Sequence, residues 1–118
     1  PTLICTAGWP SVAAIRMLSL LIESSPDVQL HYSGDFDLQG LRIARYLLAR
    51  YPQHCRLWHF DPASYMLALH DRGAVLGADE IAGLQRLPEV FSPLANVMQR
   101  ERKKAYHEGI TESLLEDM

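Results

Sequence analysis

The chain has 118 residues, which suits a single domain, and 48% of them are hydrophobic, enough to build a core at this length. The formal net charge of −3 excludes a domain that binds nucleic acid through its overall charge, because neutralising phosphates requires clustered Lys and Arg. No apolar run approaches the length of a membrane span, so we expect a cytoplasmic protein without membrane contact. Cys5 and Cys55 form no CxxC pair, which predicts two reduced core thiols.

Strand-like and helix-like segments alternate along the first part of the chain. Thr2–Cys5, Val28–Tyr32 and Cys55–Phe60 have the apolar character of strands. Apolar residues recur at helical spacing from Val12 to Ile22 and again from Leu41 to Tyr51. This order predicts parallel strands joined by helical crossovers, which is the pattern of an α/β domain.

The second part of the chain is predicted to be mainly helical. Asp61 fits the N-cap, and Pro62 the first position, of a third helix. A loop is expected over residues 71–80, and helical segments are expected over residues 79–87, 92–108 and 110–118. We therefore predict a parallel sheet with flanking helices and a helical C-terminal part.

Two aspartates, Asp35 and Asp37, stand between the predicted strand that ends at Tyr32 and the helix that follows. Ligands of parallel α/β sheets bind beyond the carboxyl ends of the strands. Two neighbouring carboxylates repel each other, and Mg²⁺ or Mn²⁺ relieves that repulsion with its preference for oxygen ligands. We expect the turn that begins near Gly34 to bring both acids toward one site. A structural alternative stays open, in which Asp35 accepts from turn amides and Asp37 caps the helix.

Two enzyme families that place acids after strands agree less well with this sequence. Haloacid-dehalogenase-like phosphatases use a DxD nucleophile, but they usually carry Thr or Val where this chain has Gln39. They also need a downstream Lys, and this chain offers Lys103 and Lys104 alone. Response-regulator receiver domains place their acids on separate strands, with a Lys after a later strand.

The segments CTAGWPS (residues 5–11) and HYSGDFDLQGLRIA (residues 31–44), with the acidic tail YHEGITESLLEDM (residues 106–118), carry a more specific resemblance. GDFDLQGLRIA resembles the DxD motif of Toprim domains, the metal-binding fold of topoisomerases, primases and some nucleases. More narrowly, the three segments resemble the C-terminal domain of JetD-type proteins of bacterial Wadjet defence systems. The likeness is strongest from Leu3 to Ala44.

That resemblance implies a Toprim nuclease module that cuts DNA with Mg²⁺ or Mn²⁺ in defence against plasmids and phages. JetD-type proteins resemble the A subunit of type VI topoisomerases and work beside an SMC-like ATPase complex. Residue by residue, Asp35 and Asp37 become the catalytic, metal-binding pair. The resemblance allows a homodimer without requiring one. A Toprim fold without catalysis, which docks a partner, is the alternative.

The sequence departs from the Toprim pattern at one position. Toprim domains carry a Glu at the end of an earlier strand, where this chain has Thr6. Since the chain begins at Pro1 rather than Met, we expect residues 1–118 to be a single Toprim-like domain from the C-terminal end of a longer protein. We then expect the Glu to lie upstream of Pro1 and the piece alone to be inactive.

Phosphate binding is predicted around the first turn and on the helix after the acids. Thr6, Gly8 and Ser11 lie between a strand and a helix N-terminus, where backbone N–H groups bind anions, although a plain turn and helix cap explains them too. The lysine and spacing of a P-loop are absent. Arg42, one turn from the acids, contacts phosphate or pairs with an acid of the same helix.

The C-terminal part adds charged candidates. Glu108 and Glu112 become extra ligands or charge-positioning groups by the resemblance, whereas a solvated helix face is the ordinary explanation of such residues. The densest basic patch could contact DNA phosphate or simply be solvated; it comprises Arg100, Arg102, Lys103 and Lys104.

Overall fold

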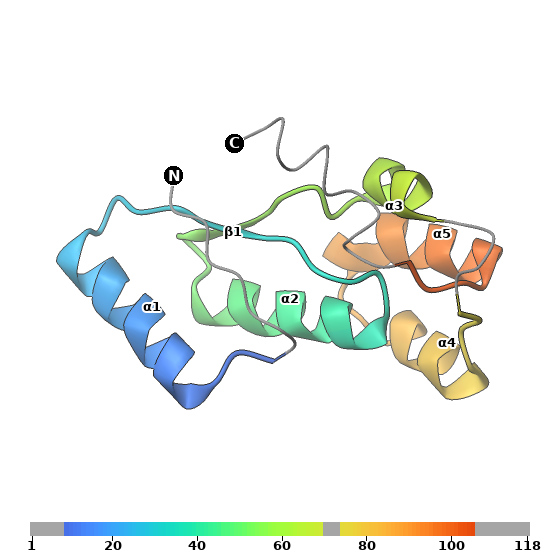
Figure 1. Cartoon of the computed structure of the whole chain (residues 1–118), viewed down its shortest axis with the longest axis horizontal. Coiled ribbons are helices and arrows are strands. Elements are labelled where there is room, and N and C mark those ends of the chain that lie inside the picture. The colour runs from blue at the N-terminus through green and yellow to red at the C-terminus, as the bar shows by residue number, and fades with distance from the viewer. Residues whose placement is uncertain (1–8, 70–73, 106–118) are drawn as a thin grey trace.

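A computed structural model describes residues 9–69 and 74–105, and Figure 1 shows their arrangement. The elements in chain order are α1 (Val12–Ser24), β1 (Leu30–Tyr32), α2 (Leu38–Arg50), β2 (Cys55–Leu57), α3 (Pro62–Ala68), α4 (Ala78–Gln85), the 3₁₀ helix η1 (Glu89–Phe91) and α5 (Ser92–Glu101). β1 and β2 pair in parallel, with Leu30 opposite Cys55 and Tyr32 opposite Leu57. The predicted mixed α/β fold with a helical C-terminal part is therefore confirmed.

Polar side chains start three of these helices. Ser11 Oγ accepts from the Ala14 N–H at 3.1 Å at the start of α1. Asp37 and Asp61 do the same for α2 and α3, accepting from residues three positions on. Each cap satisfies an N–H group that has no partner inside its helix. The predicted N-cap role of Asp61, with Pro62 at the first helical position, is confirmed.

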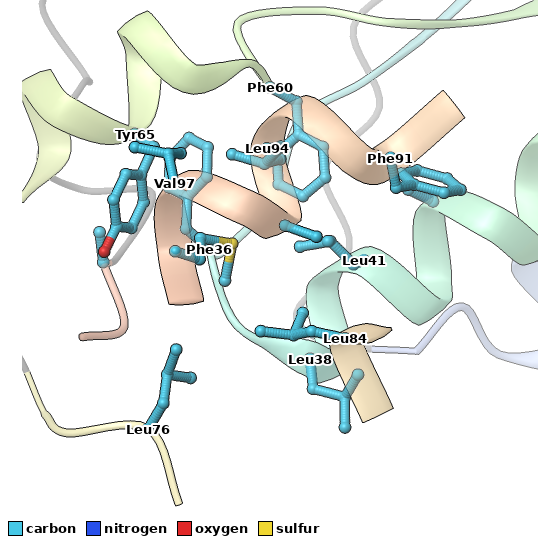
Figure 2. Close-up of a cluster of buried hydrophobic side chains, with 14 of the residues drawn as sticks. Phe36, Leu38, Leu41, Phe60, Tyr65, Leu76, Leu84, Phe91, Leu94 and Val97 are labelled. Atoms are coloured by element: carbon cyan, nitrogen blue, oxygen red, sulfur yellow. The ribbon is translucent and has the colours of Figure 1, made fainter. Parts of the chain in front are cut away.

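Helix α2 stands between two hydrophobic clusters and contributes to both. Leu38, Leu41 and Ala44 belong to the larger cluster, which α3, α4, η1 and α5 complete. Figure 2 shows the side chains of this cluster converging from the different helices. Ile43 and Leu47 belong to the smaller cluster, which lies against α1 and both strands. In Figure 1, α1 accordingly lies to one side of α2, and α3, α4 and α5 gather at the other end.

Tyr51 fastens α1 to the C-terminal end of α2. Its hydroxyl donates to the Ile15 carbonyl at 3.2 Å and lies 2.9 Å from the Ser19 hydroxyl. The Tyr51 ring is buried in the smaller cluster. This connection lies at the opposite end of α2 from the cap formed by Asp37.

The prediction of one helix over residues 92–108 is wrong for residues 102–105, and residues 106–108 lie outside the described ranges. Arg102 adopts a left-handed conformation with φ of 56° and ends α5. Lys103 then forms an antiparallel bridge with Val75, and Ala105 forms one with Phe36. The backbone groups of residues 103–105 are therefore satisfied by distant segments rather than by another helical turn.

Three boundaries differ from the predictions in smaller ways. β2 ends at Leu57 rather than Phe60, because His59 has φ of 49° and cannot continue a strand. β1 covers Leu30–Tyr32, and α4 begins at Ala78, inside the expected loop. The predicted strand Thr2–Cys5 and the predicted helix over residues 110–118 lie outside the described residues. Within the described ranges, no helix has the length and apolar character needed to cross a membrane.

Phe36, which stands between the two aspartates in the sequence, offers a direct test of the larger cluster because its side chain is fully buried. Phe36→Ala should lower the free energy of unfolding by about 3–5 kcal/mol, the usual loss for removing a buried aromatic ring. Urea denaturation followed by circular dichroism measures it. Val12→Ala is the control: Val12 is 88% exposed, so the change should stay within about 0.5 kcal/mol. Equal losses in the two variants would contradict this core.

Candidate functional site

Asp35 and Asp37 lie in the connection from β1 to α2. We call this connection, together with the first residues of α2, the acid turn (residues 34–40). β1 ends at Tyr32 and α2 begins at Leu38, so the acid turn follows the carboxyl end of a parallel strand. The predicted position of Asp35 beyond this end of β1 is confirmed. Such edges bind ligands in open α/β sheets, since the loops there are free of the sheet's own hydrogen bonding.

Phe36 fixes the acid turn to the rest of the molecule. Its N–H donates to the Ala105 carbonyl at 2.7 Å, and its carbonyl accepts from the Ala105 N–H at 3.1 Å. Its ring stacks on Phe60, with ring centroids 5.1 Å apart and an interplanar angle of 20°. Residues i and i+2 of an extended segment share a face. Because Phe36 points into the core, the flanking acids emerge on the opposite side, with Asp35 exposed and Asp37 half-buried.

Gly40 allows the acid turn to close on itself. Its N–H donates to Asp37 Oδ1 at 2.7 Å, which makes Asp37 the N-cap of α2. A Cβ atom at position 40 would overlap the Asp35 carbonyl oxygen, so only glycine permits this approach. The alternative role of Asp37 as a helix cap is therefore confirmed. That role uses one of its two carboxylate oxygens.

Tyr32 lies beneath both carboxylates. Its hydroxyl donates to the Gly40 carbonyl at 2.9 Å. Burial raises the pKa of the Tyr32 phenol far above its usual range, and the negative charges of Asp37 and Asp35 raise it further. Both carboxylates must therefore lie close enough to this one phenol to oppose its ionisation.

The remaining predicted site residues are only partly described. Ser11 caps α1 by accepting from the Ala14 N–H, in agreement with the helix-cap explanation of this residue. Arg42 is exposed on α2, one turn beyond the acid turn. Four candidates fall outside the described residues: Thr6, Gly8, Glu108 and Glu112. Within residues 9–69 and 74–105, no three His, Cys, Asp or Glu side chains form a metal-ligand group.

The residues of the predicted basic patch differ in exposure and in contacts. Lys104 Nζ forms an ion pair with Glu80 at 3.0 Å, across to α4. Lys103 is half-buried, and its carbonyl accepts from the Tyr65 hydroxyl at 2.7 Å. Arg100 and Arg102 remain exposed and keep the capacity to contact an anion. Burial, together with the negative charge of Glu101, raises the pKa of Tyr65 to about 12, so its hydroxyl remains a donor to Lys103 at neutral pH.

A second turn, residues 58–61, lies beside the acid turn and was not predicted as part of a site. It follows β2 as the acid turn follows β1, and the Ser33 hydroxyl donates to the His59 carbonyl at 3.5 Å. His59 and its neighbours open onto a cavity of about 320 Å³. The lining residues are Leu57, His59, Phe60, Asp61, Pro62, Val90, Phe91, Pro93 and Leu94. The signal in the sequence was the dipeptide Phe60-Asp61, which repeats Phe36-Asp37 before a helix.

One protein family matches the whole chain. The family described as "Protein of unknown function C-terminus (DUF2399)" matches residues 1–118. The chain belongs to this family. No curated protein and no solved structure matches the chain significantly. The description of DUF2399 assigns no activity, so function has to be argued from the site itself.

The capping role of Asp37 predicts a specific ranking of variants. Asp37→Asn should leave the free energy of unfolding nearly unchanged in the absence of divalent metal, because Asn caps helices about as well as Asp. Asp37→Ala should lower it by about 1 kcal/mol, since the Gly40 N–H then loses its acceptor. Urea denaturation in EDTA measures both variants. An equal loss for Asn and Ala would show that charge, rather than capping, accounts for the contribution of Asp37.

Proposed function

We propose that this chain is a Toprim-like nuclease module that cleaves DNA with Mg²⁺ or Mn²⁺. In this proposal it acts in a bacterial plasmid and phage defence system of the Wadjet type, beside an SMC-like ATPase complex. The acid turn is the observation that carries the proposal: two carboxylates flank a buried phenylalanine beyond the carboxyl end of a parallel strand. The sequence resemblance of residues 5–11 and 31–44 to JetD-type proteins supports it independently.

The donor set of the acid turn fits a hard divalent cation. Mg²⁺ is commonly held by one or two carboxylates, with water and substrate phosphate filling its other positions. Asp37 gives one oxygen to the Gly40 N–H, which leaves its second oxygen for a cation. Asp35 is exposed and adds a second carboxylate on the same side. We assign both residues to metal binding and to catalysis.

In this role Asp35 and Asp37 would hold a Mg²⁺ or Mn²⁺ ion. The ion would polarise a phosphate group and stabilise the leaving oxygen. Arg42 is exposed one turn into α2 and is the first arginine after the acid turn along this helix. Its guanidinium can form paired hydrogen bonds with phosphate oxygens. With a net charge of −3, the chain depends on further DNA contacts made by the protein's other parts or partners.

One observation favours a second function, a non-catalytic interaction module. Asp37 does for α2 what Asp61 does for α3, so the fold alone accounts for one of the two acids. Three large apolar side chains on and before α1 are also about half-exposed: Trp9, Met17 and Leu20. Such side chains suit the docking of a partner. Metal binding at the acid turn separates this function from the first.

Mn²⁺ should therefore stabilise the folded chain. At a concentration near its dissociation constant, a ligand that binds only the folded state adds about 0.4 kcal/mol, or about 2 °C in melting temperature for a domain of this size. Differential scanning calorimetry with and without Mn²⁺ measures the shift. The double variant Asp35→Asn, Asp37→Asn should lose it, because amide oxygens carry no charge.

Asp61→Asn is the matched control for that experiment. Asp61 caps α3 as Asp37 caps α2, but it lies outside the proposed metal site, so this variant should keep the response to Mn²⁺. Equal Mn²⁺-induced shifts in melting temperature for the parent, the double variant and Asp61→Asn would show that Mn²⁺ does not bind at Asp35 and Asp37. That result would leave the interaction module as the better function.

DNA cleavage tests the reaction itself. The chain alone should nick or cut supercoiled plasmid poorly in Mg²⁺ or Mn²⁺, because Thr6 stands where many Toprim domains have Glu. A longer protein that supplies that Glu should cut, and Asp35→Ala within it should abolish cutting. Gel electrophoresis of the plasmid resolves the nicked and linear products. Strong cutting by the chain alone that Asp35→Ala abolishes would show that the site needs no further Glu.

A further inference from the structure

Tyr32 is the last residue of β1, and the acid turn folds over its hydroxyl. The hydroxyl donates to the Gly40 carbonyl at 2.9 Å. On the other side, a Cβ atom at Gly34 would overlap the same hydroxyl. The Tyr32 ring meets the Phe60 ring edge to face, with centroids 5.4 Å apart and an interplanar angle of 81°. One phenol thus contacts both ends of the acid turn and the ring beneath it.

Gly40 connects this phenol to a proposed metal ligand. Its carbonyl accepts from Tyr32, and its N–H donates to Asp37 Oδ1 at 2.7 Å. The backbone of Asp35 lies against the same residue, since its carbonyl oxygen lies where a side chain of residue 40 would begin. A shift of Gly40 therefore moves Asp37 relative to Asp35.

The phenol suits this role because its hydroxyl donates a hydrogen bond to the Gly40 carbonyl at 2.9 Å. A phenylalanine at this position would keep the ring in place against Phe60 and would remove the hydrogen bond alone. Comparison of Tyr32 with Phe at this position thus separates the effect of the hydrogen bond from the effect of ring packing.

We propose that Tyr32 is a positioning residue for the metal site: through Gly40 its hydroxyl sets the spacing of Asp35 and Asp37 that a divalent cation requires. This inference rests on the proposed metal site at the acid turn. Groups that orient metal ligands from behind typically change metal affinity by 10- to 100-fold when they are removed. Because Tyr32 acts through Gly40 rather than on a ligand directly, we expect the lower end of that range.

The test compares the Mn²⁺ affinity of the 118-residue chain with that of its variant Tyr32→Phe. Electron paramagnetic resonance of free Mn²⁺ during a titration gives the dissociation constant, and a melting curve in EDTA gives stability separately. Tyr32→Phe should raise the dissociation constant about tenfold. A purely structural role would lower the melting temperature and leave the dissociation constant of the folded protein unchanged.

Tyr51→Phe is the matched control. It also removes a part-buried phenol hydroxyl, which contacts the Ile15 carbonyl, Ser19 and Arg50, but at the far end of α2. Its melting temperature should fall, whereas its dissociation constant for Mn²⁺ should stay within about twofold of the parent's. Comparable weakening of Mn²⁺ binding in both phenylalanine variants would overturn the assignment of Tyr32, because the effect would then follow from general loosening of α2.

Gly34→Ala is the second variant, and it decides the matter if Tyr32→Phe fails to fold. The added methyl group displaces the Tyr32 hydroxyl from Gly40, so Mn²⁺ binding should again weaken about tenfold. Unchanged Mn²⁺ affinity in a folded variant that lacks the hydrogen bond would overturn the role of Tyr32. If Asp35→Asn, Asp37→Asn abolishes binding in that case, the metal site itself stands. If the parent binds no Mn²⁺, or the double variant binds as well as the parent, both proposals fail.

Discussion

The burial of Phe36 is the constraint on which the acid turn depends. Its ring occupies the larger cluster, and its backbone pairs in both directions with Ala105. A residue held in this way cannot rotate, so its neighbours on either side must face away from the core. The core therefore determines where the two carboxylates go. Any function assigned to Asp35 and Asp37 rests on this one buried ring.

Asp37 shows how structural and chemical roles can coincide in one side chain. Its carboxylate starts α2, the helix that contributes to both hydrophobic clusters, and the positive end of the helix dipole stabilises its negative charge. That stabilisation offsets part of the repulsion between Asp37 and Asp35. Under the proposed function, this stabilisation would hold the Asp37 carboxylate in place before a cation binds.

Most of the local structure was predictable because its causes are local. The caps by Ser11, Asp37 and Asp61 follow from residue type and from the helical pattern that comes next. The end of α5 was not predictable in this way, since residues 103–105 leave the helix in order to pair with Phe36 and Val75, which are distant in sequence. The same holds for the candidate site. Asp35 and Asp37 could be found from their motif. The contact of the Tyr32 hydroxyl with Gly40 could not, because it depends on how the fold brings the two residues together.

The two neighbouring turns share a helix-capping aspartate and differ in the residue that precedes their phenylalanine. Phe36-Asp37 and Phe60-Asp61 play equivalent parts: each phenylalanine is buried, the two rings stack, and each aspartate caps the helix that follows. The residue before the phenylalanine differs, since it is Asp35 in the first turn and His59 in the second. His59 ends its strand in a left-handed conformation, which is uncommon for residues other than glycine, although histidine is among those enriched there. A helix cap requires the second carboxylate of the acid turn and makes no demand on the first. A variant of Asp35 alone therefore tests the proposed metal site with the least disturbance of the cap formed by Asp37.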